Sequence, residues 1–303
     1  MVDLKKEKLV AHLRAKYPEL AAETFRIVDS GRQNLIIVVG ERIVFRFPLT
    51  SDLSSLRLEQ RILPQLAERL PLPIPKLLYS SEPAEPAVYV GYPLVPGQSL
   101  EGGKLAALDE RTQEALARQI AGFLTALHLF DDDPITRVDT GSFQTSWRKN
   151  WGGYYRSLET LLFPRIGRRE QLWIMEVFYR YLYPPGHFEF RPCLIHGDFK
   201  NDHILYDPAA GKLTGIIDFG QLKMGDPAYD YHDLCITYGE PFSRAVLRYY
   251  KGPSDPTFLS RCMTFYANLL KFSSMMGAVQ NNDWVKFNNR LEWLKKQAKD
   301  ARK

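Results

Sequence analysis

Two neighbouring stretches decide the fold: CLIHGDFKNDHIL at residues 193–205 and GIIDFG at residues 215–220. The first reads as an apolar strand, a polar loop and the start of a second apolar strand, and the second reads as the end of a third apolar strand with an acidic residue after it, beyond a turn at DPAAG. In such a strand–loop–strand arrangement, the loop after the first strand and the residues that leave the last strand lie at the same end of the sheet. We therefore expect Asp198 and Asp218 to serve one site.

Phosphoryl transfer needs what two such carboxylates can supply. One carboxylate orients the attacking hydroxyl, and another holds a metal ion that neutralises phosphate charge. Protein kinases use the motifs HRDxxxxN and DFG in this way. The chain carries HGD at 196–198, DFG at 218–220 and DPAYD at 226–230. This set resembles the aminoglycoside phosphotransferase family, and His203 and the first strands look closest to its 2''-phosphotransferases.

The resemblance covers essentially the whole chain, is strongest over 193–234, and implies an α+β, bilobal, protein-kinase-like fold. Strand-like runs and two helical segments, 3–16 and 52–70, make up residues 1–97, which we expect to form a small β-rich nucleotide-binding lobe. The VPGQSL segment after Tyr92 reads as the connector. Helical patterns, among them runs over 147–163 and 229–251, dominate residues 98–303, the expected catalytic and substrate-binding lobe. Pro64 should kink or end one turn of the helix over 52–70.

Carried over by position, the resemblance implies roles for the motif residues. Asp198 would be the catalytic base, with Lys200 stabilising charge on the transferred group. Asp218 would be the main Mg²⁺ ligand. His203 would take the second position on the metal side, where relatives more often carry Asn, although Mg²⁺ prefers oxygen ligands.

The small lobe should bind ATP or GTP. Arg46 stands where the family more often has lysine, and Glu59 stands at the place of its helix partner. Gly31 and Asn34, in the turn SGRQN, would approach the phosphates, although Gly31 also suits a plain hairpin turn. The strand end resembles the segment that binds the purine, through Tyr92, Pro93, Leu94 and Val95, and the bulk of Tyr92 keeps guanine as an option.

An aminoglycoside is polycationic, so its site should gather carboxylates. Four acidic residues are candidates: Asp202, Asp230, Asp233 and Glu240. A net charge of +5 works against steering a cation. A macrolide, hygromycin-like or metabolic-alcohol kinase therefore remains an alternative, favoured if Trp147, Trp151, Tyr154 and Tyr155 line the pocket rather than the core. A pseudokinase-like binding module is a further alternative.

Composition narrows the class of protein. The chain has 303 residues, 45% hydrophobic and 25% charged, as expected of a packed globular protein. It has three cysteines, far apart and without metal-binding spacing, which predicts buried reduced thiols. No apolar run suits a signal or a membrane span, and no nucleic-acid motif accompanies the basic C-terminal run. We expect a cytoplasmic monomer that binds neither nucleic acid nor membrane.

Overall fold

The computed structural model describes residues 2–28, 34–82, 85 and 87–300. They form two compact units, Met1–Leu100 with Asp202–Leu222, and Glu101–Asn201 with Lys223–Lys303. The chain thus passes between the units at Leu100–Glu101, at Asn201–Asp202 and at Leu222–Lys223. The predicted boundary at residue 97 between a nucleotide-binding and a catalytic lobe stays a prediction. The contacts within the folded chain place residues 202–222 in the first unit as well.

The first unit is built on a five-stranded antiparallel sheet in the order β1-β2-β3-β5-β4. Its elements are α1 (Val2–Lys16), the 3₁₀ turn η1 (Pro18–Leu20), β1 (Phe25–Val28), β2 (Asn34–Val39), β3 (Ile43–Pro48), α2 (Ser54–Arg69), β4 (Tyr79–Ser80) and β5 (Val90–Pro93). The two predicted helices and the strand-like runs are thereby confirmed. The sequence predicts that Pro64 should either kink the second of these helices or end one of its turns. The helix α2 continues through Pro64 to Arg69, so it does not end there.

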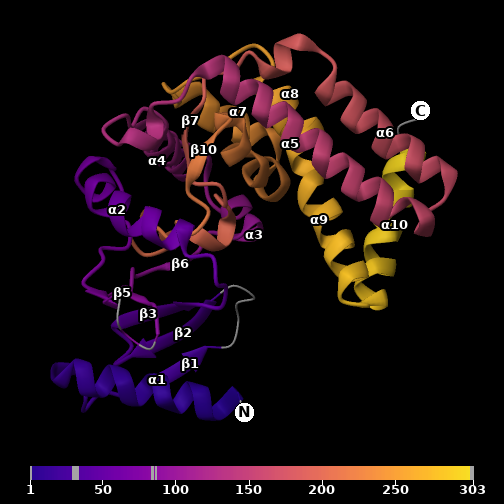
Figure 1. Cartoon of the computed structure of the whole chain (residues 1–303). Coiled ribbons are helices and arrows are strands. Elements are labelled where there is room, and N and C mark those ends of the chain that lie inside the picture. Colours follow the sequence, from indigo (N-terminus) through magenta and orange to yellow (C-terminus); the bar gives the residue numbers. More distant parts are fainter. Residues whose placement is uncertain (1, 29–33, 83–84, 86, 301–303) are drawn as a thin grey trace. The chain divides into compact units, whose positions relative to one another are not determined.

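The two faces of this sheet differ in chemistry. Alternate residues of a strand point to opposite faces, and Ile37, Phe45 and Phe47 form a core with Leu13 of α1. Arg46 of β3 therefore points to the other face. Figure 1 shows α1 on one side of the sheet and α2 on the opposite side. The polar face of β3 is thus the one that α2 approaches.

A smaller sheet, in the order β6-β8-β9, completes the first unit. Its strands are β6 (Gln98–Ser99), β8 (Ile204–Asp207) and β9 (Lys212–Ile216), and the 3₁₀ turn η5 (Asn201–His203) precedes β8. β6 pairs with β8, and the Ile216 N–H donates to the Pro73 carbonyl at 2.9 Å. These bonds explain why residues 202–222 group with the N-terminal part of the chain.

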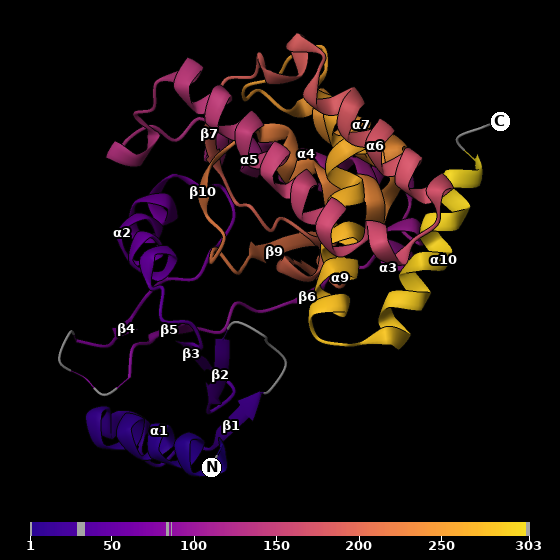
Figure 2. The same cartoon turned by 45° about the vertical axis from the view of Figure 1, so that its right-hand side comes forward.

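The second unit is mainly helical (Figure 2). Its α-helices are α3 (Gly102–Ala106), α4 (Glu110–His128), α5 (Thr140–Leu161), α6 (Arg168–Leu182), α7 (Gly239–Tyr249), α8 (Phe258–Ser260), α9 (Ala267–Gln280) and α10 (Trp284–Asp300). Its short elements are the 3₁₀ turns η2 (Pro134–Thr136), η3 (Phe163–Arg165), η4 (Pro185–Phe188) and η6 (Pro227–Tyr231), the π-helical turns η7 (Leu234–Tyr238) and η8 (Arg261–Tyr266), and the antiparallel strands β7 (Cys193–Ile195) and β10 (Lys223–Gly225).

Two helical predictions differ from the structure. The helix expected over 147–163 begins earlier, at Thr140, because the Asp139 carboxylate accepts the Ser142 N–H at 2.9 Å and caps it. The helix expected over 229–251 is broken into η6, η7 and α7. Within the described residues, no helix combines the length and the apolar character that a membrane span requires.

Candidate functional site

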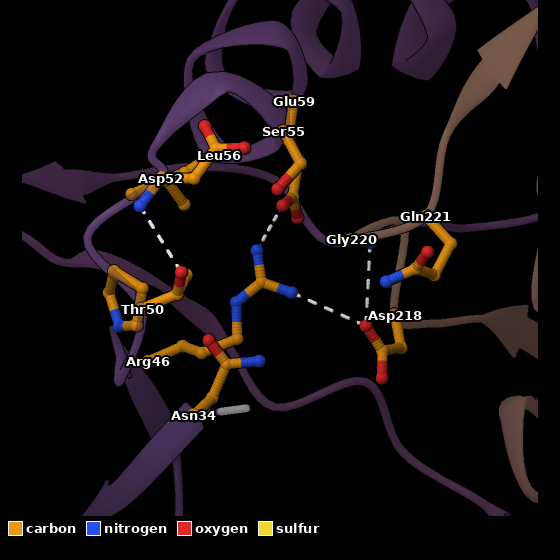
Figure 3. Close-up of a pocket in the computed structure, with 11 residues that line it drawn as sticks. Asn34, Arg46, Thr50, Asp52, Ser55, Leu56, Glu59, Asp218, Gly220 and Gln221 are labelled. Atoms are coloured by element: carbon orange, nitrogen blue, oxygen red, sulfur yellow. Dashed lines mark hydrogen bonds and ion pairs between the residues drawn. The ribbon is translucent and has the colours of Figure 1, made fainter. Parts of the chain in front are cut away.

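Arg46 is the centre of a polar cluster in the first unit (Figure 3). Its Nη2 pairs with Oε2 of Glu59 on α2, and its Nη1 lies 3.3 Å from Oδ1 of Asp218. Arg46 and Glu59 are buried, at 4% and 1% exposure, while the side chain of Asp218 is 44% exposed. Three segments far apart in the sequence thus meet at one guanidinium.

The charge state of Arg46 follows from its neighbours. Burial disfavours the charged guanidinium, but Glu59, Tyr92 and Asp218 outweigh burial and raise the pKa of Arg46 above its ordinary value. Two of its nitrogens hold the carboxylates. The third, Nε, is buried and has no hydrogen-bond partner among the described residues. A buried cationic donor without a partner is costly to the fold, and is suited to an anionic ligand.

A cavity of about 380 Å³ opens beside this cluster. Its walls come from β2, β3, the start of α2 and the segment after β9: Asn34, Arg46, Pro48, Thr50, Asp52, Ser55, Leu56, Glu59, Asp218, Gly220 and Gln221. Asn34, predicted from the turn SGRQN, is among them. Gly31, its partner in that prediction, lies outside the described residues.

Asp218 has an unusual backbone. Its φ is +64°, a left-handed conformation that few residues other than glycine adopt, and that is associated with functional sites. Its Oδ1 accepts the Gly220 N–H at 3.4 Å, and its Oδ2 lies 3.4 Å from Nε2 of His203. The His203 carbonyl accepts the Ile217 N–H at 3.0 Å. His203 is therefore a buried neighbour of the carboxylate.

Asp198 lies in the second unit, on the loop after β7. Its Oδ2 pairs with Lys200 Nζ at 2.9 Å, and both side chains are about one-third exposed, at 30% and 32%. Gly197 has a φ of +77°, so the HGD sequence needs glycine where a side chain would be strained. The structure therefore brings Asp198 and Lys200 together, as it does Arg46, Glu59, Asp218 and His203 in the first unit.

Buried carboxylates hold the Asp198 loop. Asp230 is fully buried and accepts the N–H groups of His196 at 2.7 Å and Gly197 at 2.9 Å. His128 Nε2 lies 3.1 Å from Asp230. Burial would raise the pKa of Asp230, but His128, His196 and the Gly197 N–H lower it below its usual value. Asp230 therefore stays ionised, with its oxygens engaged.

Asp233 acts on the end of the same loop. It is 6% exposed, and its Oδ2 accepts the Asn201 N–H at 3.0 Å and the Thr237 hydroxyl at 3.1 Å. The other two acidic candidates are more accessible. Asp202 is exposed, and Glu240 pairs with Arg244 and has a 43% exposed side chain.

The predicted purine-binding segment lies at the end of β5. Tyr92 shares the sheet face of Arg46, since it pairs with Val44, and burial raises the pKa of its hydroxyl to about 12. The Leu94 N–H donates to the Arg42 carbonyl at 2.7 Å. Pro93 and Val95 are half-buried beside it.

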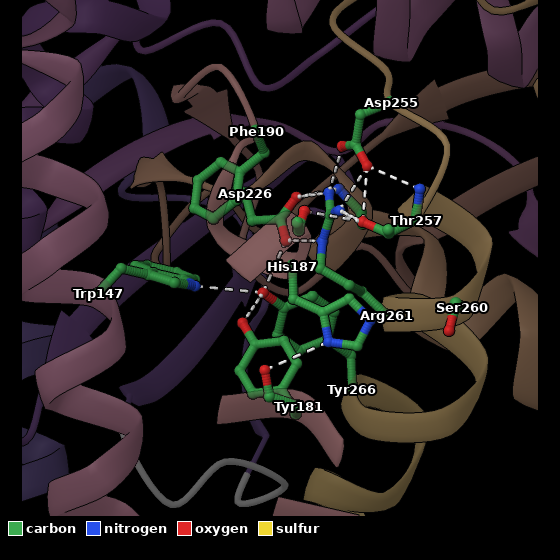
Figure 4. A network of polar contacts seen from close by, with 12 residues as sticks. Trp147, Tyr181, His187, Phe190, Asp226, Asp255, Thr257, Ser260, Arg261 and Tyr266 are labelled. Carbon is green, nitrogen blue, oxygen red and sulfur yellow. Dashed lines mark hydrogen bonds and ion pairs between the residues drawn. The ribbon is translucent and has the colours of Figure 1, made fainter. Parts of the chain in front are cut away.

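Sequence reasoning missed a second arginine cluster, in the second unit (Figure 4). Arg261 Nε donates to Asp226 Oδ2 at 2.6 Å and its Nη2 to Oδ1 at 2.9 Å, while Nη1 and Nη2 each donate to Asp255 at 2.8 Å. Tyr266 donates to Asp226 at 2.8 Å. Of these residues only Asp226 stood out in the sequence, as the first residue of DPAYD, and its carboxylate caps η6 by accepting the Ala228 N–H at 3.0 Å.

Trp147, Trp151 and Tyr154 of α5 pack in the interior of the helical unit, whereas Tyr155 lines an apolar cavity together with Met175 and Tyr179. Trp147 is 9% exposed and donates from Nε1 to the Tyr266 hydroxyl at 3.1 Å. Trp151 packs edge-on against Phe265, and the Tyr154 hydroxyl lies 2.7 Å from Ser273 Oγ. The helical spacing of Trp147, Trp151 and Tyr154 therefore reflects core packing.

Comparison with known protein families identifies a match over most of the chain. The model described as "Phosphotransferase enzyme family" matches residues 24–260. Viomycin phosphotransferase of Streptomyces vinaceus is 27% identical over 157 residues, which are 50% of this chain and 51% of that protein. Acyl-CoA dehydrogenase family member 10 of Mus musculus is 26% identical over 201 residues, which are 63% of this chain and 17% of that protein. The chain thus matches about half of the length of the first of these relatives and less than a fifth of the length of the second.

Solved structures agree in fold over nearly the whole chain. A GDP complex of wild-type aminoglycoside 2'-phosphotransferase-IIIa has a TM-score of 0.81 and 25% identity, covering 98% of this chain and 99% of that one. A GDP and kanamycin complex of an aminoglycoside phosphotransferase has a TM-score of 0.83 and 25% identity, covering 97% and 99%. Macrolide 2'-phosphotransferase type I, 18% identical, shares the fold, with a TM-score of 0.70 and coverage of 95% and 96%. The predicted α+β, bilobal, kinase-like fold is confirmed.

Proposed function

Because the chain belongs to the phosphotransferase enzyme family, we propose that it transfers the γ-phosphoryl group of ATP or GTP to a hydroxyl of an aminoglycoside. One observation carries the proposal: the buried Arg46 binds Glu59 and Asp218, lines a cavity, and keeps an Nε that has no partner among the described residues. A kinase site needs a cation on the nucleotide phosphates, held by a helix carboxylate, and a second carboxylate for the metal.

Arg46 would hold the phosphates of the nucleotide. Its guanidinium is always charged and planar, and Glu59 and Asp218 fix the plane from two sides. Asn34, at the edge of the same cavity, would add a hydrogen bond to a phosphate oxygen. Fixed donors of this kind stabilise charge that develops in the transition state without reorganising.

Asp218 has the chemistry of a Mg²⁺ ligand. Its carboxylate is partly exposed, and hard oxygen ligands are what Mg²⁺ requires. When bound there, Mg²⁺ would neutralise charge on the phosphate oxygens. His203 is buried, with a nitrogen 3.4 Å from Asp218 Oδ2, so we propose that it orients this carboxylate rather than binding the metal itself.

Asp198 would accept or orient the proton of the acceptor hydroxyl. The 2.9 Å contact with Lys200 keeps this carboxylate in place, and Lys200 would stabilise the charge on the transferred group. Asp230 and Asp233 hold the surrounding backbone. We propose that these two position the loop, and that Asp202 and Glu240 meet the cationic acceptor.

The end of β5 would bind the purine. The Leu94 N–H is already used by Arg42, so we propose that the Val95 N–H serves the base and that Tyr92 and Pro93 flank it. The bulk of Tyr92 supports use of GTP as well as ATP. Because Trp147, Trp151 and Tyr154 pack in the core, the macrolide alternative keeps only Tyr155, which lines an apolar cavity of about 420 Å³.

A coupled assay of nucleotide turnover tests the proposal. Kanamycin and gentamicin should stimulate phosphate transfer from ATP or GTP, and a macrolide should not. Asp198→Asn should lower kcat by orders of magnitude and leave nucleotide affinity largely unchanged. Turnover with the macrolide alone would reject the acceptor class. Nucleotide binding without turnover on any acceptor would favour a pseudokinase-like module.

A further inference from the structure

The second unit brings together two cysteines that are distant in the sequence. Cys235 lies in η7 and Cys262 in η8, and their Sγ atoms are 2.7 Å apart, although 27 positions separate the residues. Both thiols are free. The third cysteine, Cys193, is buried in β7. Neither cysteine is among the groups that we propose for phosphoryl transfer.

We propose that Cys235 and Cys262 are a reversible dithiol–disulfide site that closes when the protein meets a peroxide-class, two-electron oxidant. A disulfide places its sulfur atoms about 2.05 Å apart, so the two thiols need only a small approach to bond. The fold has already brought the two segments together, which removes the cost of closing the intervening loop.

The two thiols differ in accessibility, and this sets the order of the chemistry. Cys262 is fully buried, whereas Cys235 is partly exposed. The hydrogen bond from Cys262 lowers the pKa of the Cys235 thiol, and burial raises the pKa of Cys262. Since the thiolate is the nucleophile and must be reached by the oxidant, Cys235 reacts first and Cys262 resolves.

The reaction balances with hydrogen peroxide as the oxidant. The Cys235 thiolate attacks one peroxide oxygen, the O–O bond breaks, and a sulfenic acid and hydroxide form. The Cys262 sulfur then attacks Sγ of Cys235, loses its proton and displaces the sulfenic oxygen as water. The two sulfurs together lose two electrons, and the peroxide is reduced.

The bond would join two structurally important turns. Two residues before Cys235 is Asp233, whose carboxylate accepts the Asn201 N–H of the Asp198 loop. Immediately before Cys262 is Arg261, which pairs with Asp226 and Asp255. Oxidation would therefore fix the turn that supports the Asp198 loop to the turn that anchors the helical core.

Thiol counting on the full chain tests this proposal without an activity assay. Reduced protein is treated with hydrogen peroxide, denatured with an alkylating reagent and analysed by mass spectrometry. Of the three cysteines, only Cys193 should still be alkylated, a peptide link should join Cys235 to Cys262, and dithiothreitol should restore all three thiols. Three alkylated thiols after peroxide, or a link that includes Cys193, would overturn the proposal.

Three variants separate the roles. Cys193→Ser is the matched control and should keep the loss of two thiols. Cys262→Ser should leave a sulfenic acid on Cys235 that dimedone traps, and Cys235→Ser should leave Cys262 alkylated after peroxide. Equal peroxide reactivity of Cys262 in Cys235→Ser would refute the assigned order. Circular dichroism checks that each variant folds, and the peptide map of the unaltered chain stands independently of them.

Discussion

The two units of the molecule each place a buried arginine between two carboxylates, and the two clusters are completed differently. Arg261 donates from all three nitrogens to Asp226, Asp255 and Thr257, and neither Arg261 nor Asp226 is exposed. Arg46 uses two nitrogens for Glu59 and Asp218, keeps Nε unpartnered among the described residues, and lies beside a cavity. A saturated cluster serves the fold, whereas an unsaturated one beside a cavity is suited to a ligand.

The exposure of the carboxylates also separates the cluster that serves the fold from the cluster that is suited to a ligand. Removing charges from water is costly unless geometry and hydrogen bonds repay the cost. For Arg261 the cost is offset because its guanidinium donates two hydrogen bonds to Asp226 and two to Asp255. Burial opposes its charge, but Asp226 and Asp255 raise its pKa well above the ordinary value. Asp218, by contrast, keeps a 44% exposed side chain. Substitutions in the Arg46 cluster should therefore mainly lower the rate of phosphoryl transfer, whereas substitutions in the Arg261 cluster should mainly lower the stability of the fold.

Asp218→Asn should give the largest effect on turnover. The amide keeps the shape but removes the charge that would bind Mg²⁺, so kcat should fall by about 10³-fold or more. The melting temperature should shift by less than about 2 °C, because the side chain is partly exposed. Coupled assays and thermal melts measure the two quantities.

The matched change in the other cluster is Asp226→Asn. It should lower the melting temperature far more than Asp218→Asn does, since Arg261 loses a fully buried partner. If Asp218→Asn instead melted early and kept its turnover, the distinction between the two clusters would be wrong.

Arg261→Met should give the largest effect on stability. The change leaves Asp226 buried without its ion pair, which should cost about 3–5 kcal/mol of the free energy of unfolding. Urea unfolding followed by circular dichroism measures the loss. Arg180→Ala is the control, because its ion pair with Glu176 is exposed and should contribute no more than about 1 kcal/mol. Equal losses in both variants would show that the Arg261 cluster does not stabilise the core.

Arg46→Lys and Arg46→Met should give intermediate effects on nucleotide use. Lysine keeps the charge but loses the planar fork, so kcat/KM for the nucleotide should fall by no more than about tenfold. Methionine removes the charge and should lower it by about 10²-fold or more. Initial rates over a range of nucleotide concentrations separate the two outcomes. A Met variant as active as the Lys variant would remove Arg46 from the phosphate site.

The sequence predicts one cluster and not the other for a physical reason. Asp218 and Asp198 lie in short motifs, and Arg46 and Glu59 follow from a resemblance that fixes their positions relative to those motifs. Arg261 lies inside a helical run with no local signal, because its partners Asp226 and Asp255 are chosen by tertiary packing.

Other features also depend on contacts that no local pattern encodes. The bond of the Asp230 carboxylate to two backbone N–H groups needs the folded loop, and the Cys235–Cys262 contact spans 27 positions. The replacement of one expected helix by η6, η7 and α7 likewise depends on tertiary contacts rather than on a local pattern. Strands and amphipathic helices were predictable because their periodicity is local.

The smallest expected effect concerns acid stability of the saturated cluster. Burial would raise the pKa of Asp255, but Arg261 and Thr257 lower it below its ordinary value. The folded-state pKa is thus below the unfolded value of about 3.9. The stabilisation is complete above about pH 4 and is lost as the pH falls through the folded-state pKa.

Asp255→Asn should therefore lower the free energy of unfolding at neutral pH and lower it progressively less in acid, because asparagine cannot titrate. Urea unfolding between pH 7 and about pH 2.5 measures both curves. Curves that approach each other as the pH falls would assign the acid sensitivity to the ion pair with Arg261. Curves that stay parallel would mean that Asp255 stabilises the second unit through hydrogen bonds that do not depend on its charge, and the two arginine clusters would then differ less in electrostatics than in how completely their donors are satisfied.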